Sequence, residues 1–369
     1  MSLPTPWALI AGGGTAGHTL PAVAIGQALV ERGHPTDRIH FVGSARGSEA
    51  ELVPAAGFGI TLLPGRGIQR KLSPANVTAI LGILAAFARA LLLVGRRRPA
   101  VVVAMGGYAS VAVAMAAVLW RVPMVVAEQN AVPGAANRLA ARFARASAVA
   151  FPNTGLPREV LTGNPVRRDV RDLRDADREG CKGAVGVPSD RCLVLVFGGS
   201  LGARHLNSAT LEAVDGWRER DDLTVRHVIG ARDWDEFEHP DLAGSRLSYL
   251  AVRYEYDMPR ALAAADLVIS RAGATTVAEL TTLGRPAILV PLPGAPGDHQ
   301  TANARALAEA GAAVLLPDSE LTGARLRSEV DALVADASRR DAMAAASRGL
   351  GRPDAADRVA ELVEEHARR

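Results

Sequence analysis

Short apolar runs alternate with glycine turns and helical patterns along the first 145 residues. Residues 7–11 (WALIA) predict a strand, residues 12–18 (GGGTAGH) a turn and residues 21–33 a helix. The same unit recurs three times, with predicted strands at 39–43, 101–105 and 124–130 and helices at 48–57, 111–120 and 134–144. Alternating units of this kind predict a parallel sheet covered by helices.

A second α/β domain is predicted after a linker. Residues 163–183 are rich in proline, glycine and arginine, and they keep neither a helical nor a strand periodicity for long. Strand, turn and helix patterns then resume from 193 and continue to a helix at 299–310. Two open sheets joined in this way are expected to bind ligands in a cleft between the carboxyl ends of their strands.

The first turn satisfies the G-x-G-x-x-G spacing of a dinucleotide site through Gly12, Gly14 and Gly17. Such a site also expects an acid at the end of the next strand, where this chain has Gly43 and Ser44 instead. Arg46 could meet a 2′-phosphate. A dinucleotide site and a turn needed only for helix packing therefore both stay open at this point.

His18 follows that turn at a helix start, where the helix dipole favours a neutral imidazole that can act as a base. A buried or capping histidine is the alternative. Further turns follow the other predicted strands or lie in the linker, and their polar groups would crowd one cleft. They are 106–108, 128–130, 163–167, 198–200 and 271–274, the last leading to Glu279.

Charge is distributed unevenly over the 369 residues. The formal net charge is +3, yet residues 52–127 contain eight Lys and Arg and no acid, so the remainder sums to 3 minus 8, or −5. The basic segment predicts an anionic partner surface. Aromatic residues make up 4% of the chain and do not alternate with the bases, which argues against nucleic acid.

The uncharged run at 100–120 is long enough to suggest a membrane span, but Gly106 and Gly107 divide it into a strand-like and a helix-like half. Two cysteines, Cys181 and Cys192, provide no disulfide framework and suit a reducing cytosol. The first residues lack the pattern of a secretory signal, so we expect the mature protein to begin there.

Seven motifs, in order, resemble the MurG family of N-acetylglucosamine transferases over nearly the whole chain. They are GGGTAGH, MGGYAS, EQNAVPGAANR, FPNT with TGNPVR, FGGSLGARHLN, SRAGATTVAEL and GDHQTANA. The resemblance implies a GT-B fold of two Rossmann-like domains and a metal-independent, cofactor-free inverting transfer from UDP-GlcNAc to lipid I, the undecaprenyl-diphosphate-linked muramyl pentapeptide. It also implies a role in peptidoglycan synthesis, and so in cell shape and division.

The resemblance implies three regions. Residues 1–163 would bind the acceptor and the membrane, residues 164–345 would bind UDP-GlcNAc, and the helix at 346–369 would pack back on the first domain. The protein would lie peripherally on the cytoplasmic face of the membrane, against anionic phospholipid, with other cell-wall synthesis proteins as candidate partners. The segment 67–98, including Arg70, Lys71 and Arg89, would dock there, although its leucines also suit an ordinary core helix.

Residue by residue, the resemblance makes His18 the base and places Tyr108 and Asn130 around the acceptor or transferred sugar. Thr15, Ala16 and Gly17 form the substrate turn, in which many members carry glycine where this chain has Ala16. Arg167 and Ser200 match diphosphate contacts, and Glu279, with Ala274 and Thr275, matches the ribose contact. Gln300 matches a GlcNAc contact, Met258 lies near the uracil, and His299 stands where some members have glutamine.

Three other functions compete with this interpretation. A natural-product glycosyltransferase or a UDP-GlcNAc 2-epimerase would share the GT-B fold, but neither needs the basic, apolar segment. A membrane-docking scaffold without turnover would not need His18, Arg167 and Glu279.

Overall fold

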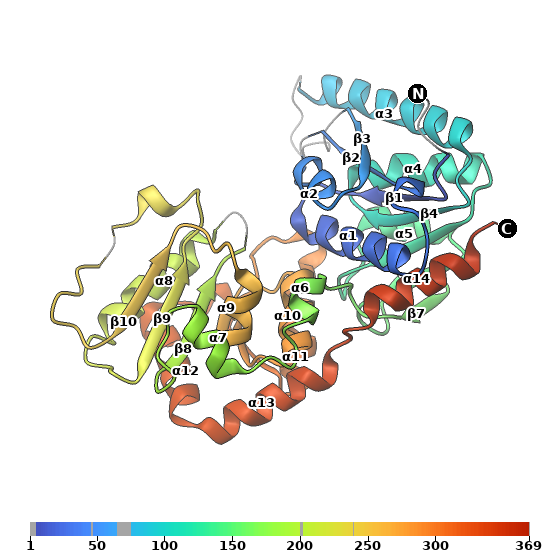
Figure 1. The fold of residues 1–369 in the computed structure, drawn as a ribbon. Coiled ribbons are helices and arrows are strands. Elements are labelled where there is room, and N and C mark those ends of the chain that lie inside the picture. Colours follow the sequence, from blue (N-terminus) through green and yellow to red (C-terminus); the bar gives the residue numbers. More distant parts are fainter. Residues whose placement is uncertain (1–4, 46, 65–74, 200–201, 239, 369) are drawn as a thin grey trace. The chain divides into compact units, whose positions relative to one another are not determined.

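The computed structural model describes residues 5–45, 47–64, 75–199, 202–238 and 240–368, with residues 75–81 described by their backbone alone. The chain forms two compact units. The first contains residues 1–167 and 352–369, and the second contains residues 168–351. The chain therefore passes between the units twice, and each unit is an α/β layer structure (Figure 1).

The first unit is built on a seven-stranded parallel sheet with the order β3-β2-β1-β4-β5-β6-β7. The central strands are almost fully buried and rich in valine, as expected for a sheet that is covered on both faces. The strands are β1 (Ala8–Gly12), β2 (Ile39–Ser44), β3 (Gly59–Leu63), β4 (Val101–Gly106), β5 (Met124–Glu128), β6 (Ala146–Val149) and β7 (Glu159–Leu161).

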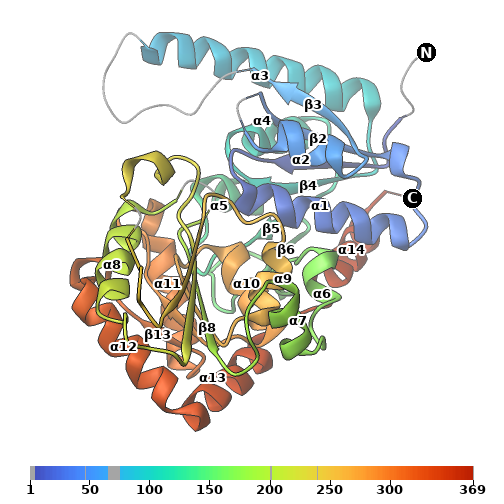
Figure 2. The ribbon, with the colours of Figure 1, turned by 60° about the vertical axis from the view of Figure 1, so that its left-hand side comes forward.

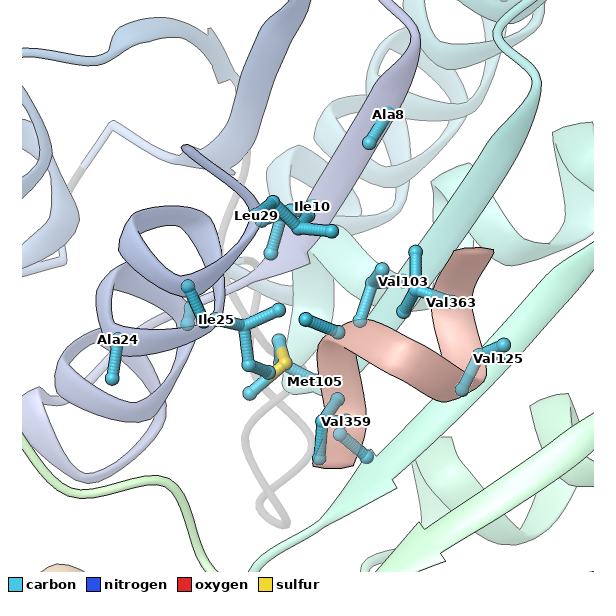
Figure 3. Packing of buried hydrophobic residues seen from close by; sticks show 14 of the residues in the cluster. Ala8, Ile10, Ala24, Ile25, Leu29, Val103, Met105, Val125, Val359 and Val363 are labelled. Atoms are coloured by element: carbon cyan, nitrogen blue, oxygen red, sulfur yellow. The ribbon is translucent and has the colours of Figure 1, made fainter. Parts of the chain in front are cut away.

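One face of this sheet is covered by α1 (Ala16–Glu31), α2 (Glu49–Ala55) and α14 (Ala355–His366). Figure 3 shows Ile25 and Leu29 of α1 and Val359 and Val363 of α14 in one apolar cluster with Ile10 and Met105 of the sheet. Arg32 donates to Glu364 and Glu361, and His34 pairs with Glu364 at 2.9 Å. The last helix thus completes the core of the first unit, although the whole second unit, residues 168–351, separates it in sequence from the rest.

The opposite face is covered by α3 (Ala75–Arg97), α4 (Tyr108–Leu119) and α5 (Ala135–Ala141) (Figure 2). Helix α3 packs through Ala86, Ala90 and Val94, which are fully buried, while Leu84 and Leu92 are 59% and 55% exposed. The segment is therefore partly core and partly an exposed apolar surface. Among the described residues, no helix is both apolar and long enough to span a bilayer.

The second unit has a six-stranded parallel sheet with the order β10-β9-β8-β11-β12-β13. Helices α8 and α12 pack on one face, and α7, α9 and α10 lie on the other (Figure 2). The strands are β8 (Cys192–Phe197), β9 (Leu223–Val228), β10 (Ser248–Val252), β11 (Leu267–Ser270), β12 (Ala287–Leu289) and β13 (Ala313–Leu315).

The second unit contains eight helices in its described residues. They are α6 (Arg168–Arg171), α7 (Arg178–Ala184), α8 (Arg204–Asp215), α9 (Met258–Ala264), α10 (Ala274–Leu283), α11 (His299–Glu309), α12 (Gly323–Ala335) and α13 (Ala337–Leu350). Short 3-10 turns occur at Thr36–Arg38, Trp234–Glu236, Pro296–Asp298 and Asp318–Glu320.

Two of the differences between the structure and the sequence expectations lie where the chain passes from one unit to the other. The segment 163–183 is not an irregular linker, because it contains α6 and α7, and the Asp177 carboxylate caps α7 by accepting from the amides of Glu179 and Gly180. Residues 346–351 end α13 in the second unit, so the segment that returns to the first unit begins at 352 rather than 346.

Candidate functional site

Two glycine turns press against each other at the carboxyl edge of the first sheet. The register between β1 and β4 shifts at Met105, so that Gly12 lies opposite Gly106. A Cβ on Gly107, which has φ +82°, would lie 2.4 Å from the carbonyl oxygen of Gly13. Because Gly107 has no side chain, the turn after β4 can lie directly against the turn after β1, and the two turns form one continuous surface.

The carboxylate of Glu49 packs against the first turn, and this residue is only 2% exposed. Its oxygens accept from the Gly14 amide at 2.9 and 3.1 Å and from the Ser44 amide at 2.6 Å. A Cβ on Gly13 would lie 2.0 Å from this carboxylate. In a dinucleotide site these amides face a pyrophosphate, so an acid in this place opposes the dinucleotide interpretation.

His18 lies in the first turn of α1, beside both glycine turns. Its Nδ1 is 3.3 Å from the Thr15 hydroxyl. Its Nε2 and Cδ2 atoms lie 3.3 and 3.4 Å from the position that a Cβ on Gly106 would occupy. The half-buried imidazole therefore faces the point where the turns after β1 and β4 meet. Ala16 and Gly17, which the sequence analysis placed in the turn, begin the same helix.

The loop after β5 is organised by the buried carboxylate of Glu128. It accepts from the Asn130 amide at 3.0 Å, from the Asn130 side chain at 3.2 Å and from the Gly134 amide at 3.1 Å. It also accepts from Nδ2 of Asn137 at 2.9 Å. That Nδ2 atom lies 3.3 Å from the position of a Gly106 Cβ, on the same turn that His18 approaches. The structure thus brings His18 and the Glu128 cluster to one edge.

Tyr108 begins α4 and is directed differently from the other predicted residues. Its hydroxyl lies 3.0 Å from the Pro64 carbonyl and 3.1 Å from the Gly82 carbonyl, so its one proton is shared between them. Burial raises the pKa of the hydroxyl. The contact ties α4 to α3 and to the end of β3, which gives Tyr108 a structural role in this conformation.

In the second unit, a buried polar chain supports the glycine loop after β8. The Asn207 side chain donates to Asp233 at 3.2 Å and accepts from Nε2 of His227 at 3.0 Å. The Tyr249 hydroxyl pairs with Nδ1 of His227 at 3.0 Å, and burial raises the pKa of this tyrosine. A Cβ on Gly202 would lie 2.9 Å from the Asp233 carboxylate, so this chain reaches the loop itself.

The turn after β11 is held by side chains of α11. Gln300 accepts from the Ala272 amide at 3.2 Å and from the Leu292 amide at 3.0 Å, while Asn303 donates to the Ala272 carbonyl at 3.1 Å. The Gln300 oxygen therefore joins the loops that follow β11 and β12. Arg271 is bound to Asp318 at 2.5 Å and to the carbonyl of Val290, below the same edge.

The remaining predicted residues are distributed over both units. Ala274 and Thr275 begin α10, and Glu279 follows on its second turn, 6% exposed. Met258 begins α9, which is capped by Asp257. His299 donates from Nδ1 to the Pro296 carbonyl at 2.8 Å, and Arg167 is half-buried in the first unit. The predicted residues that lie outside the described part of the chain are Ser200, Arg46, Arg70 and Lys71.

Sequence reasoning assigned no role to Glu49, Asn137, Asn207 or Asp233, and it treated Glu128 only as part of a turn. For Asn137 and Asn207 the signal was present, since both lie inside the family motifs. For Glu49 and Asp233 no local pattern marks the residue, because each acts on a glycine turn that is distant in sequence. Over the described part of the chain, no His, Cys, Asp and Glu side chains group as three potential metal ligands.

The comparisons with known proteins agree over both units. Residues 8–149 match the glycosyltransferase family 28 N-terminal domain, and residues 193–359 match the family 28 C-terminal domain. The crystal structure of Acinetobacter baumannii MurG is similar with a TM-score of 0.76 and 29% identity, covering 97% of this chain and 99% of that chain.

Two curated relatives carry one name, UDP-N-acetylglucosamine–N-acetylmuramyl-(pentapeptide) pyrophosphoryl-undecaprenol N-acetylglucosamine transferase. The protein of Desulforudis audaxviator (strain MP104C) is 42% identical, covering 97% of this chain and 98% of its own. That of Anaeromyxobacter sp. (strain Fw109-5) is also 42% identical, covering 98% of this chain and 93% of its own. With identity at this level over both units, the chain belongs to glycosyltransferase family 28 and, within it, to the MurG family of N-acetylglucosamine transferases.

Proposed function

We propose that this chain transfers GlcNAc from UDP-GlcNAc to the muramyl 4-hydroxyl of the undecaprenyl-diphosphate-linked pentapeptide. The acceptor binds at the carboxyl edge of the first sheet, and UDP-GlcNAc binds to the second unit. The observation that carries the proposal is the placement of His18, whose Nε2 faces the turn at Gly106 beside the Glu128 cluster. The transfer needs a base beside the acceptor hydroxyl, and the reaction itself is the one that the relatives' shared name describes.

In this mechanism His18 takes the proton of the 4-hydroxyl while the hydroxyl oxygen attacks the anomeric carbon of GlcNAc. The bond between that carbon and the UDP oxygen breaks, and the configuration inverts. A positioned base typically contributes about 10² to 10⁴ in rate. Negative charge that develops on UDP is stabilised by Arg167 and by backbone amides at the starts of the helices after β8 and β11.

The donor contacts are assigned to residues of the second unit. Glu279 is proposed to hold the ribose hydroxyls, with Ala274 and Thr275 beside it, and Met258 to lie near the uracil. Gln300 is proposed to contact the sugar. Its oxygen accepts two backbone amides, so the sugar contact belongs to its amide nitrogen. His299 and Tyr108 hold backbone carbonyls in this structure, and the proposal assigns Tyr108 a place beside the acceptor through its ring.

A turnover assay tests the reaction. Purified protein is incubated with UDP-GlcNAc and a lipid-linked muramyl-pentapeptide acceptor, and UDP release is measured with and without the acceptor. We expect release that depends on the acceptor, together with a disaccharide product. Hydrolysis of UDP-GlcNAc without acceptor, or formation of a 2-epimer, would replace the proposal with one of the other GT-B activities.

We further propose that the first unit docks on the anionic cytoplasmic leaflet through α3. Its outer side presents Leu84 and Leu92, and Arg89 and Arg96 are exposed on the same helix. Arg98 lies 4.5 Å from the ring of Trp120, which joins the end of α4 to this surface. Each base near an anionic membrane contributes about 1 kcal/mol, and the leucines can enter the interface.

Vesicle co-sedimentation tests the docking. Binding should rise with the anionic lipid fraction and fall with salt, and the double variant Arg89→Gln/Arg96→Gln should bind more weakly. The matched control, Arg325→Gln/Arg339→Gln, removes two exposed arginines from the second unit and should bind like the wild type. Equal binding to neutral and anionic vesicles would refute electrostatic docking.

A further inference from the structure

A shallow apolar groove runs along the outside of the first unit between α4 and α5. It is lined entirely by apolar side chains, including Val111, Met115, Val118, Leu139 and Phe143. Leu139 and Phe143 are 38% and 53% exposed, so the groove is open to solvent.

The groove leads away from the candidate acceptor site. One end is at Val111 and Ala136, which lie one turn after Tyr108 and immediately before Asn137. The other end is at Val118, near the end of α4, and at Met124, the first residue of β5. Seven helical residues separate Val111 from Val118, or about 10 Å of groove. The groove therefore joins the carboxyl edge of the sheet to its amino edge.

The exposed charged residues of the segments that form the groove are basic. Arg138 and Arg142 are exposed on either side of Leu139. Between residues 52 and 158 the sequence contains one acid, Glu128, and its buried carboxylate is bound to Asn130, Gly134 and Asn137. An anionic group joined to an apolar chain would match this arrangement, with the anion near the arginines and the chain along the groove.

We propose that the groove between α4 and α5 binds the isoprene units of the lipid-linked acceptor that lie nearest its diphosphate. The proposal rests on the transferase function above, since it places the acceptor's sugar at the end of the groove beside Asn137. When the sugar is bound, the chain attached to it is held beside the groove at high local concentration. A free bilayer lipid has no such attachment and gains no such increase in concentration at the groove. The groove would thus make the acceptor's chain part of what the enzyme recognises.

The test measures acceptor KM in detergent micelles for two acceptors that share one headgroup, a short-chain acceptor and a long polyprenyl acceptor. The wild type should have a KM about tenfold lower for the long chain, because burial of part of it is favourable. The double variant Leu139→Ser/Phe143→Ser should lose that difference while keeping kcat on the short acceptor and the KM for UDP-GlcNAc. The matched control, Val160→Ser/Leu350→Ser, removes two exposed apolar side chains that lie outside the groove and should keep the preference for the long chain.

A second measurement does not depend on turnover of the long acceptor. Undecaprenyl phosphate, which has the chain without the sugar, should inhibit the wild type on the short acceptor more strongly than the groove variant. A wild type that does not distinguish the chains, or a control that loses the preference equally, would overturn the groove as a chain site and leave the transferase function standing. Failure of the wild type to use either acceptor would instead refute the proposed function.

Discussion

Replacement of Glu49 by alanine should destabilise the first unit locally, around the turn that carries His18. The carboxylate accepts from the backbone amides of Gly14 and Ser44. Glu49 is also the first residue of α2, where a negative charge interacts favourably with the helix dipole. A hydrogen bond to a charged group contributes about 1.5–3 kcal/mol, so the two amides give roughly 3–6 kcal/mol. Water can replace part of this at the exposed Gly14, and we therefore expect a loss of about 3 kcal/mol.

Hydrogen exchange read by mass spectrometry can locate this loss, which is necessary because a two-unit chain need not unfold in one step. Peptides that cover β1, β2 and the turns after them should exchange faster in Glu49→Ala, while peptides of the second unit should be unchanged. The control is Glu51→Ala, an exposed acid on the same helix, which should change the free energy by less than about 0.5 kcal/mol.

The activity of the Glu49 variant should also fall, because the turn that orients His18 loses its support. Glu49→Gln keeps the size of the side chain, but its amide group can accept through only one oxygen, so this variant should fall between the wild type and alanine. Equal protection of the β1 peptides in Glu49→Ala and Glu51→Ala would refute the reasoning, since the carboxylate would then contribute nothing beyond an exposed acid.

His18→Ala should lower kcat by about 10² or more and leave UDP affinity nearly unchanged, since His18 belongs to the first unit and UDP is assigned to the second; near-normal turnover would reduce the histidine to a turn residue. Glu279→Ala should weaken UDP binding roughly ten- to a hundredfold in calorimetry, and unchanged affinity would end the ribose assignment. Burial lowers the pKa of His40 from 6.5 to about 4, so its neutral form is favoured in the fold. Its stabilisation is complete above pH 6.5 and lost as the pH falls towards 4, by at most about 3 kcal/mol; His40→Gln should flatten urea-derived unfolding free energies over that range, and an unchanged slope would contradict the burial argument.

The sequence determined the architecture and the family. Alternating apolar runs and helical patterns predicted two parallel α/β domains, because these periods reflect which side of each element is buried and need only neighbouring residues. The short strands β3 and β7 at the two sheet edges were not predicted, since edge strands are only partly buried and their pattern is weak. The ordered glycine motifs identified the family because their turns must lie at strand ends.

Tertiary structure alone decided which groups complete those turns. Glu49 reaches Gly14 across 35 residues, Tyr108 reaches Pro64 across 44, and Arg32 reaches Glu364 across 332. No local period encodes such a pair, because each contact depends on how whole helices pack on a sheet. The same packing brings α4 beside α5 and so forms the apolar groove, and it returns α14 to the core of the first unit. Short-range physics thus fixed the elements, and long-range packing fixed the surroundings of the site.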